Sequence, residues 1–84
     1  MLMLYFALID SEADQLRFSD IYSNYQKQML LVAKRILHSD EDAEDAVQDT
    51  FLQYYNSKKE FESEQHIRAW LIRVAINKAK NMNL

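Results

Sequence analysis

The chain has 84 residues, of which 13 are acidic and 10 are basic, for a formal net charge of −3, and it contains no glycine, proline or cysteine. This length gives room for one domain with a thin core, and the lack of the usual turn residues favours an all-helical fold. Without cysteine there are no disulfides or thiolate metal ligands, and His38 and His66 stand apart, so we expect no metal, no other cofactor and a cytoplasmic location.

The amino-terminal residues 1–9 are apolar and predict a short packing helix. The segment has no basic residues, and no small-residue cleavage pattern follows it, so a signal peptide is not favoured. It is also far shorter than the roughly 20 residues that span a bilayer. We therefore expect no association with a membrane.

A long helix is predicted over residues 11–38. Ser11 is suited to cap it, with Asp14 three residues later as in a capping box. Apolar residues then recur every three or four positions for about five turns, as on the buried face of a helix. They are Phe18, Ile21, Tyr22, Tyr25, Met29, Val32, Ala33, Ile36 and Leu37.

A second main helix is predicted over residues 40–56, with Ser39 as its cap. Its inward stripe consists of Ala43, Ala46, Val47, Thr50, Phe51 and Tyr54. The helix dipole accounts for acids in the first turn, but Asp45, Gln48 and Asp49 lie beyond that turn. The pattern leaves two interpretations open for these three residues: a docking face for a partner or an ordinary solvated surface.

A polar stretch follows and predicts a loop over residues 57–65, in which Phe61 is the apolar exception. A last helix is predicted over 66–81, with Ser63 or Glu64 as its earliest start. Residues 1–64 hold 13 acids and six bases, net −7, whereas residues 65–84 hold four bases and no acid, net +4. We expect the three helices to meet in a core that includes Ile21, Tyr25, Val47, Phe51, Leu71 and Val74.

One face of this last helix combines an aromatic residue with cations and amides: Trp70, Arg73, Asn77, Lys80 and Asn81. The opposite side is more apolar and includes Leu71, Ile72 and Ala75. Cations suit phosphates, amides suit base edges and rings stack on unpaired bases, which indicates contact with nucleic acid. The alternative is that the cations complement the helix dipole and that Trp70 belongs to the core.

Four segments in order carry a family resemblance. They are Phe18-Ser-Asp-Ile-Tyr22, Ala33-Lys-Arg-Ile-Leu37, Asp42-Ala-Glu-Asp-Ala-Val-Gln-Asp-Thr-Phe-Leu52 and the run from Arg68 to Asn81. Over residues 16–81 the chain closely resembles region two of bacterial sigma factors of the extracytoplasmic-function (ECF) type. The resemblance implies a compact bundle of three main helices plus the short N-terminal helix. It also implies a transcription initiation domain that binds RNA polymerase core and recognises and helps melt the minus-ten promoter element.

The resemblance assigns roles to three sets of residues. Asp45, Gln48 and Asp49 match positions that face the clamp helices of the beta-prime subunit. Trp70, Arg73, Asn77, Lys80 and Asn81 match the helix that lies along promoter DNA, with Asn77 as the expected base reader. Lys58, Lys59, Phe61 and His66 fall in the loop that receives a base flipped out of the non-template strand. In that loop Glu60, Glu62 and Glu64 would oppose phosphates, and Phe61 could equally be a core anchor.

Other classes of protein fit less well. No paired acid and base, nucleophile group or metal cluster can be assembled, so an enzyme is not expected. The alternative function is a helical interaction module that does not bind DNA, such as a sigma-like adaptor or a decoy held by an anti-sigma factor, which is also a candidate partner. Complete family members continue into a second promoter-reading domain, which is absent from these 84 residues. We therefore expect weak binding to duplex promoter by this domain alone.

Overall fold

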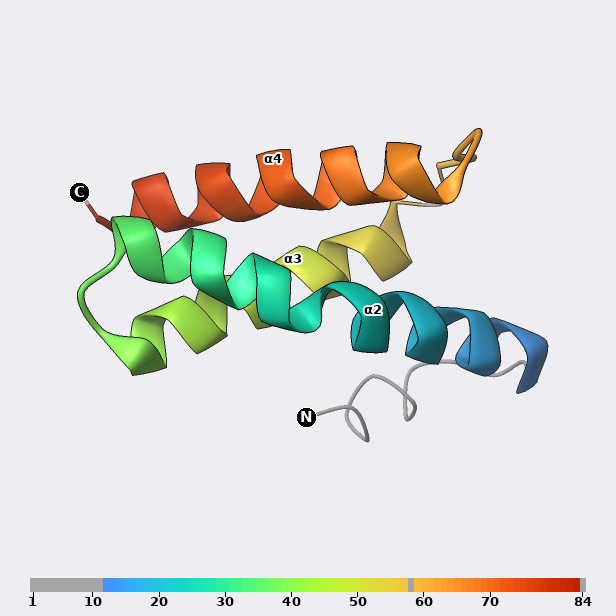
Figure 1. Ribbon diagram of the computed structural model, residues 1–84, viewed down its shortest axis with the longest axis horizontal. Helices are drawn as coiled ribbons and strands as arrows, with labels where there is room; N and C mark the ends of the chain where they lie inside the picture. Colours follow the sequence, from blue (N-terminus) through green and yellow to red (C-terminus); the bar gives the residue numbers. More distant parts are fainter. Residues whose placement is uncertain (1–11, 58, 84) are drawn as a thin grey trace.

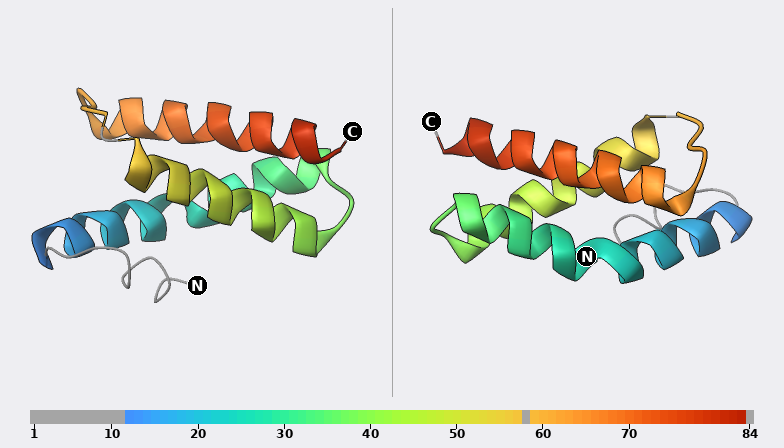
Figure 2. Two further views of the ribbon diagram at one scale, coloured as in Figure 1. Left: turned by 180° about the vertical axis from the view of Figure 1, so that it is seen from behind. Right: turned by 45° about the horizontal axis from the view of Figure 1, so that its top comes forward.

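A computed structural model describes residues 12–57 and 59–83. These residues form three helices, α2 (Glu12–Ile36), α3 (Asp40–Asn56) and α4 (Glu64–Met82). Helices α2 and α4 run in the same direction and α3 runs in the opposite direction (Figure 1). Each helix contacts the other two, as the two further views also show (Figure 2). The all-helical bundle expected from the sequence is confirmed, whereas the helix predicted over 1–9 lies outside the described residues.

The ends of the helices follow from their capping residues. Helix α3 has the predicted bounds. Helix α2 ends at Ile36, two residues before the predicted end, and one further backbone bond from Leu37 N to Ala33 O closes its last turn. Helix α4 begins at Glu64, two residues before position 66, because the Ser63 hydroxyl accepts a hydrogen bond from His66 N at 3.1 Å.

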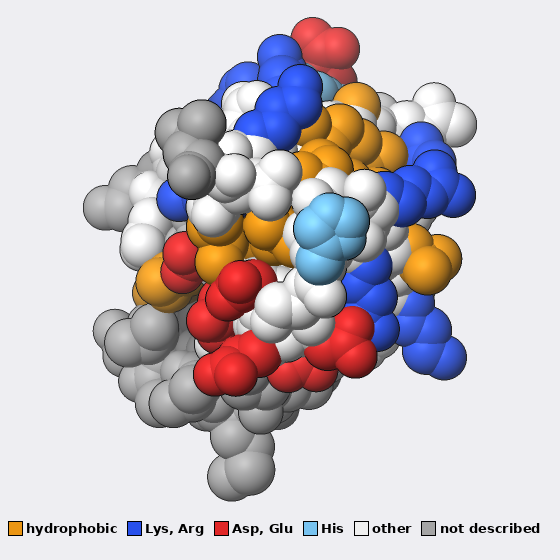
Figure 3. Space-filling view, turned by 90° about the vertical axis from the view of Figure 1, so that its left-hand side faces the viewer, with side chains coloured by type: hydrophobic (Ala, Val, Ile, Leu, Met, Phe, Trp, Pro, Cys, Tyr) orange, Lys and Arg blue, Asp and Glu red, His pale blue; other side chains and the backbone are white. Residues whose placement is uncertain are grey.

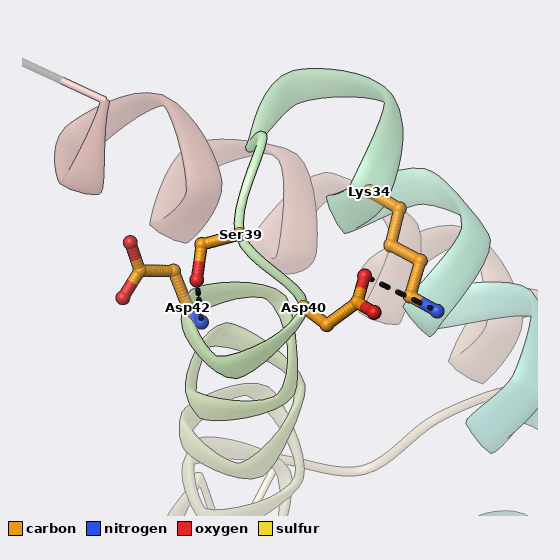
Figure 4. A network of polar contacts seen from close by, with 4 residues as sticks. All are labelled: Lys34, Ser39, Asp40 and Asp42. Atoms are coloured by element: carbon orange, nitrogen blue, oxygen red, sulfur yellow. Dashed lines mark hydrogen bonds and ion pairs between the residues drawn. The ribbon is translucent and has the colours of Figure 1, made fainter.

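The turn between α2 and α3 is held by two polar contacts (Figure 4). Ser39 Oγ accepts a hydrogen bond from Asp42 N at 3.2 Å, which is the cap predicted for this helix. Lys34 Nζ lies 3.6 Å from Asp40 Oδ1, but both side chains are exposed, so this ion pair adds little to stability. The cap is therefore the contact that fixes the start of α3.

The core lies where the three helices meet, and each helix contributes to it. Phe51 is fully buried, its ring centroid 4.9 Å from that of Tyr22 and 6.3 Å from that of Phe18. Thr50, the buried polar residue of the described core, donates from Oγ1 to Ala46 O at 2.7 Å. The buried apolar residues are Phe18, Ile21, Met29, Ala33, Leu37, Ala43, Ala46, Val47, Phe51, Ile67, Trp70, Leu71, Val74, Ala75 and Ala79.

Five of the six residues expected to converge in the core are buried: Ile21, Val47, Phe51, Leu71 and Val74. The sixth, Tyr25, is partly buried and packs against the others. Among the residues that the structure describes, no helix is long and apolar enough to cross a membrane.

We expect two partly buried tyrosines, Tyr22 and Tyr54, to make the domain less stable at alkaline pH. Burial raises the pKa of Tyr22 above its ordinary value, and Glu44 raises it further. Burial also raises the pKa of Tyr54, against a lowering effect of Arg17. A tyrosine in the unfolded chain ionises near pH ~10, whereas these two keep their protons to higher pH when folded. The free energy of unfolding is therefore unaffected by them below about pH 10 and falls as the pH rises above it.

Thermal melts between about pH 8 and pH 11 test this expectation, because they bracket the ordinary tyrosine pKa. The alkaline fall in melting temperature should become shallower in Tyr22→Phe and in Tyr54→Phe. An identical fall in the wild type and in both variants would show that these tyrosines are not its cause.

Candidate functional site

Charged side chains are segregated on the surface of the bundle. In an end-on view, most of the visible Asp and Glu side chains gather below the centre, with further acidic atoms at the top edge, while Lys and Arg side chains occupy much of the top and the right-hand side (Figure 3). This arrangement follows from the order of the chain, since α3 is acidic and α4 after Glu64 contains no acid. The molecule thus offers surfaces of opposite charge to its surroundings.

Helix α3 positions the acidic row predicted as a docking face. Asp45 and Asp49 are exposed, and Gln48 between them is partly exposed. They are held outward because Ala46, Val47 and Thr50 on the other side of the helix are buried. Two carboxylates and an amide on successive turns present hydrogen-bond acceptors to a cationic partner, and such charge-assisted bonds are the stronger kind.

Helix α4 presents the row predicted to contact nucleic acid, with one exception. Arg73, Asn77, Lys80 and Asn81 are exposed. Trp70 is not, since only 8% of its surface is accessible.

The placement of Trp70 has a simple physical reason. The residue lies three and four positions from Ile67 and Val74, which are both buried, so its ring can turn to the same side of the helix. There it packs 6.2 Å from the ring of Tyr54 and 5.7 Å from that of Phe61. Trp70 is therefore a core residue, which is the second of the two interpretations that the sequence left open. Leu71 and Ala75 are fully buried beside these residues, and Ile72 is partly buried.

The connection between α3 and α4 is organised around Phe61. Its partly buried ring lies 5.7 Å from Tyr54 and 5.1 Å, edge to face, from His66. His66 Nδ1 also accepts a hydrogen bond from Glu62 N at 3.2 Å, which requires that nitrogen to be unprotonated. Lys59 Nζ lies 5.8 Å from the Phe61 ring centroid. Lys58, also predicted for this loop, lies outside the described residues.

A pocket of about 830 Å³ lies beside this loop. Aromatic rings of Phe18, Tyr54 and Phe61 form part of its wall, and Arg17 and Lys59 place cations at it. Its other described lining residues are Tyr55, Asn56, Ser57 and Glu60. Rings beside cations suit a planar, unpaired base attached to a phosphate backbone. The contribution of Arg17, Phe18 and Tyr54 could not be predicted from the sequence, because the pocket joins segments that lie far apart along the chain.

Among the described residues, no group of three His, Cys, Asp or Glu side chains is placed to hold a metal ion. The described residues form three notable surface features: an acidic row on α3, an exposed polar and basic row on α4, and a pocket with aromatic walls.

These features define a small helical binding domain, and comparison with known proteins identifies its kind. The family Sigma-70 region 2 matches residues 21–82, and the chain belongs to this family. Sigma factors are transcription initiation factors and not enzymes. No solved structure shows a significant match to the chain.

Relatives of the chain include sigma factors of the ECF type. The chain is 34% identical over 70 residues to the ECF RNA polymerase sigma-E factor of Haemophilus influenzae, a match that covers 83% of this chain and 36% of that protein. It is 31% identical over the same length to the sigma-E factor of Escherichia coli K12, with the same coverage. The RNA polymerase sigma-H factor of Pseudomonas aeruginosa is 32% identical over 68 residues, covering 81% of this chain and 35% of that protein. The chain thus spans about a third of the length of these relatives.

Proposed function

We propose that this domain docks on the beta-prime clamp helices of RNA polymerase core through α3, and recognises and helps melt the minus-ten promoter element through α4 and the 57–63 loop. The observation that carries the proposal is the separation of an exposed acidic row from an exposed basic row in a chain that matches Sigma-70 region 2 over residues 21–82. Such a domain would act where the polymerase acts, in the cytoplasm.

Docking through α3 rests on the exposure of Asp45 and Asp49 and on the partial exposure of Gln48. Clamp residues that carry guanidinium groups would donate to the carboxylates and to the amide oxygen. Closure of such an interface removes water from these bonds, so that loss of one partner leaves a buried polar group unsatisfied. The domain has a net charge of −3. An acidic surface of this kind favours a partner whose surface is positively charged.

Promoter recognition rests on α4. Arg73 and Lys80 can meet phosphates, while Asn77 and Asn81 can donate to and accept from base edges. Opened DNA offers an unstacked base of the non-template strand, and the pocket beside Phe61 can receive a flat ring. Buried Trp70 packs against Phe61 and would contribute through the position of that ring.

A second candidate function is a helical interaction module that binds no DNA, for example an adaptor or a decoy held by an anti-sigma factor. It would use the α3 row alone. The exposed basic row of α4 favours the first candidate, because a module without a DNA partner has no need of cations and amides together on one helix.

Charge reversal on α3 tests the docking proposal. We expect Asp45→Lys and Asp49→Lys, and truncation by Gln48→Ala, to weaken binding to an isolated clamp-helix fragment by about 1–3 kcal/mol, or about fivefold to 150-fold. Titration calorimetry measures the affinity, and circular dichroism checks that each variant is folded.

The matched control is Asp20→Lys, which makes the same change in net charge at an exposed position of α2. Its affinity should stay within about twofold of the wild type, since long-range charge alone has a small effect at physiological salt. If the three α3 variants are folded and all bind as the wild type does, the docking assignment is wrong.

A further inference from the structure

The amino terminus of α4 is closed by two hydrogen bonds that run in opposite directions. Ser63 Oγ accepts from His66 N at 3.1 Å, and His66 Nδ1 accepts from Glu62 N at 3.2 Å. Such a reciprocal pair resembles a capping box, in which the side chain of the third helical residue reaches back to an amide at the start of the helix. That third residue is ordinarily Glu or Gln, whereas α4 has a histidine there.

The His66 ring also contacts the aromatic residues of the 57–63 loop. It lies 5.1 Å, edge to face, from the ring of Phe61. Phe61 in turn packs 5.7 Å from the rings of both Tyr54 and Trp70, and it lines the pocket. His66 itself is not one of the lining residues. Phe61 is therefore the contact through which His66 can act on the pocket.

A histidine differs from glutamine as the acceptor of such a cap, because it can take up a proton. A neutral imidazole can accept a hydrogen bond at Nδ1, but an imidazolium carries a hydrogen on both nitrogens and accepts none. Protonation would set the Nδ1–H of His66 against the backbone N–H of Glu62, so that two donors face each other. Either the ring or the backbone at residues 61 and 62 would then have to move, and both movements disturb the contact with Phe61.

Histidine is the side chain whose charge ordinarily changes between about pH 5 and pH 8, whereas carboxylates, tyrosine, lysine and arginine ordinarily titrate outside that range. The titratable or charged residues around His66 and its loop belong to those other types. They are Lys59, Glu60 and Glu62 on the loop, Glu64 and Arg68 on α4, Tyr54 on α3 and Arg17 on α2. A response of the loop to pH in this range is therefore expected to come from His66.

We propose that neutral His66 is a positioning residue, which holds Phe61 in the place where the pocket can receive an unpaired base, and that its protonation releases the loop. The part of this proposal that concerns the base rests on the proposed function. It predicts that binding of a single strand weakens as the pH falls. A histidine that touched the DNA directly would do the opposite, because an added positive charge strengthens contact with phosphates.

The free 84-residue chain tests the position of Phe61 without any DNA. Nuclear Overhauser effects between the rings of Phe61 and Trp70 are measured by NMR at about pH 8 and about pH 5.5, which bracket the range in which histidine titrates. We expect their intensity to fall by at least about half at the lower pH, as the loss of one hydrogen bond allows. Two variants should show no such fall: His66→Gln, which has the usual acceptor at both pH values, and His66→Ala, which has none at either.

The matched control is His38→Asn, which removes the other histidine of the chain. His38 is exposed in the turn between α2 and α3, at the opposite end of the bundle from the 57–63 loop (Figure 1). This variant should keep the pH response of the wild type. The proposal is overturned if the wild type shows the same ring contacts at both pH values, or if His66→Gln responds to pH as the wild type does.

The complex with core polymerase tests the consequence for DNA. The affinity for a non-template single strand that carries a minus-ten element is measured at the same two pH values. Dividing the affinity of the wild type by that of His66→Gln at each pH cancels the response of the polymerase itself. We expect this ratio to fall by about twofold to tenfold between the higher and the lower pH, which is the effect of one hydrogen bond.

The outcomes separate this proposal from the proposed function. A ratio that rises at the lower pH would overturn the positioning role in favour of a direct phosphate contact, and a constant ratio would show that the pocket does not depend on the cap. If no variant binds the strand at about pH 8, where His66 is expected to be neutral, the proposed function fails. The ring contacts of the free chain would still decide whether His66 positions Phe61.

Discussion

Replacing Phe51 by alanine is expected to lower the free energy of unfolding by about 3–5 kcal/mol. The ring is fully buried and packs against Phe18 and Tyr22, so its removal takes away both its transfer free energy and the aromatic contacts. A domain of this size has a total stability of only about 4–13 kcal/mol. The variant is therefore expected to be partly unfolded near physiological temperature.

Urea denaturation of the wild type and of Phe51→Ala measures this loss. Leu31→Ala is the matched control, since it removes a large apolar side chain that is 61% exposed, and its effect should stay within about 0.5 kcal/mol. Equal midpoints for Phe51→Ala and the wild type would show that Phe51 is not a core residue.

The second large effect is expected on promoter recognition. Asn77→Ala should reduce discrimination at one position of the minus-ten element by about 1–3 kcal/mol, because a side-chain amide can form paired hydrogen bonds with a base edge. Lys80→Ala should instead weaken binding to every sequence alike, because a phosphate contact carries no base information. The two residues are one helical turn apart and both exposed, so each variant should fold normally.

A competition assay separates these two effects. Polymerase core with the bound domain is offered a labelled non-template strand against unlabelled strands that differ by single bases. Asn77→Ala should flatten the preference at one position, and Lys80→Ala should shift all affinities together and reduce their salt dependence. An unchanged preference profile for Asn77→Ala, together with a selective change for Lys80→Ala, would contradict the assigned roles.

The helices were predictable because local sequence determines them. Ser39 caps α3, and the apolar stripe runs without a break to Tyr54 in the last turn, so the bounds of the helix follow from capping and periodicity. The start of α4 agrees with the predicted opening at Ser63 or Glu64, whereas the narrower bound at residue 66 is two residues late. The first turn of α4, from Glu64 to Gln65, is polar and resembles the loop before it, so the Ser63 cap was the available signal there.

The exposed rows on α3 and α4 could also be predicted, since helical spacing places residues on faces. Trp70 shows the limit of that reasoning. Its position lies at the border between the exposed row and the buried stripe, and the indole turns to the buried side, where it packs against the rings of Tyr54 and Phe61. The pocket depends even more on tertiary structure, because Arg17 and Phe18 meet the 54–61 segment only once the bundle has formed.

The most direct test of the proposed function is a strand preference measured with and without polymerase. A labelled single strand that carries a minus-ten element is titrated with the 84-residue chain, with core polymerase, and with both together, and fluorescence anisotropy reports binding. We expect weak binding by the chain alone, since its net charge is −3, and tight binding by the complex with preference for the non-template over the template strand. A complex that binds both strands equally, or no more tightly than polymerase alone, would contradict the proposal.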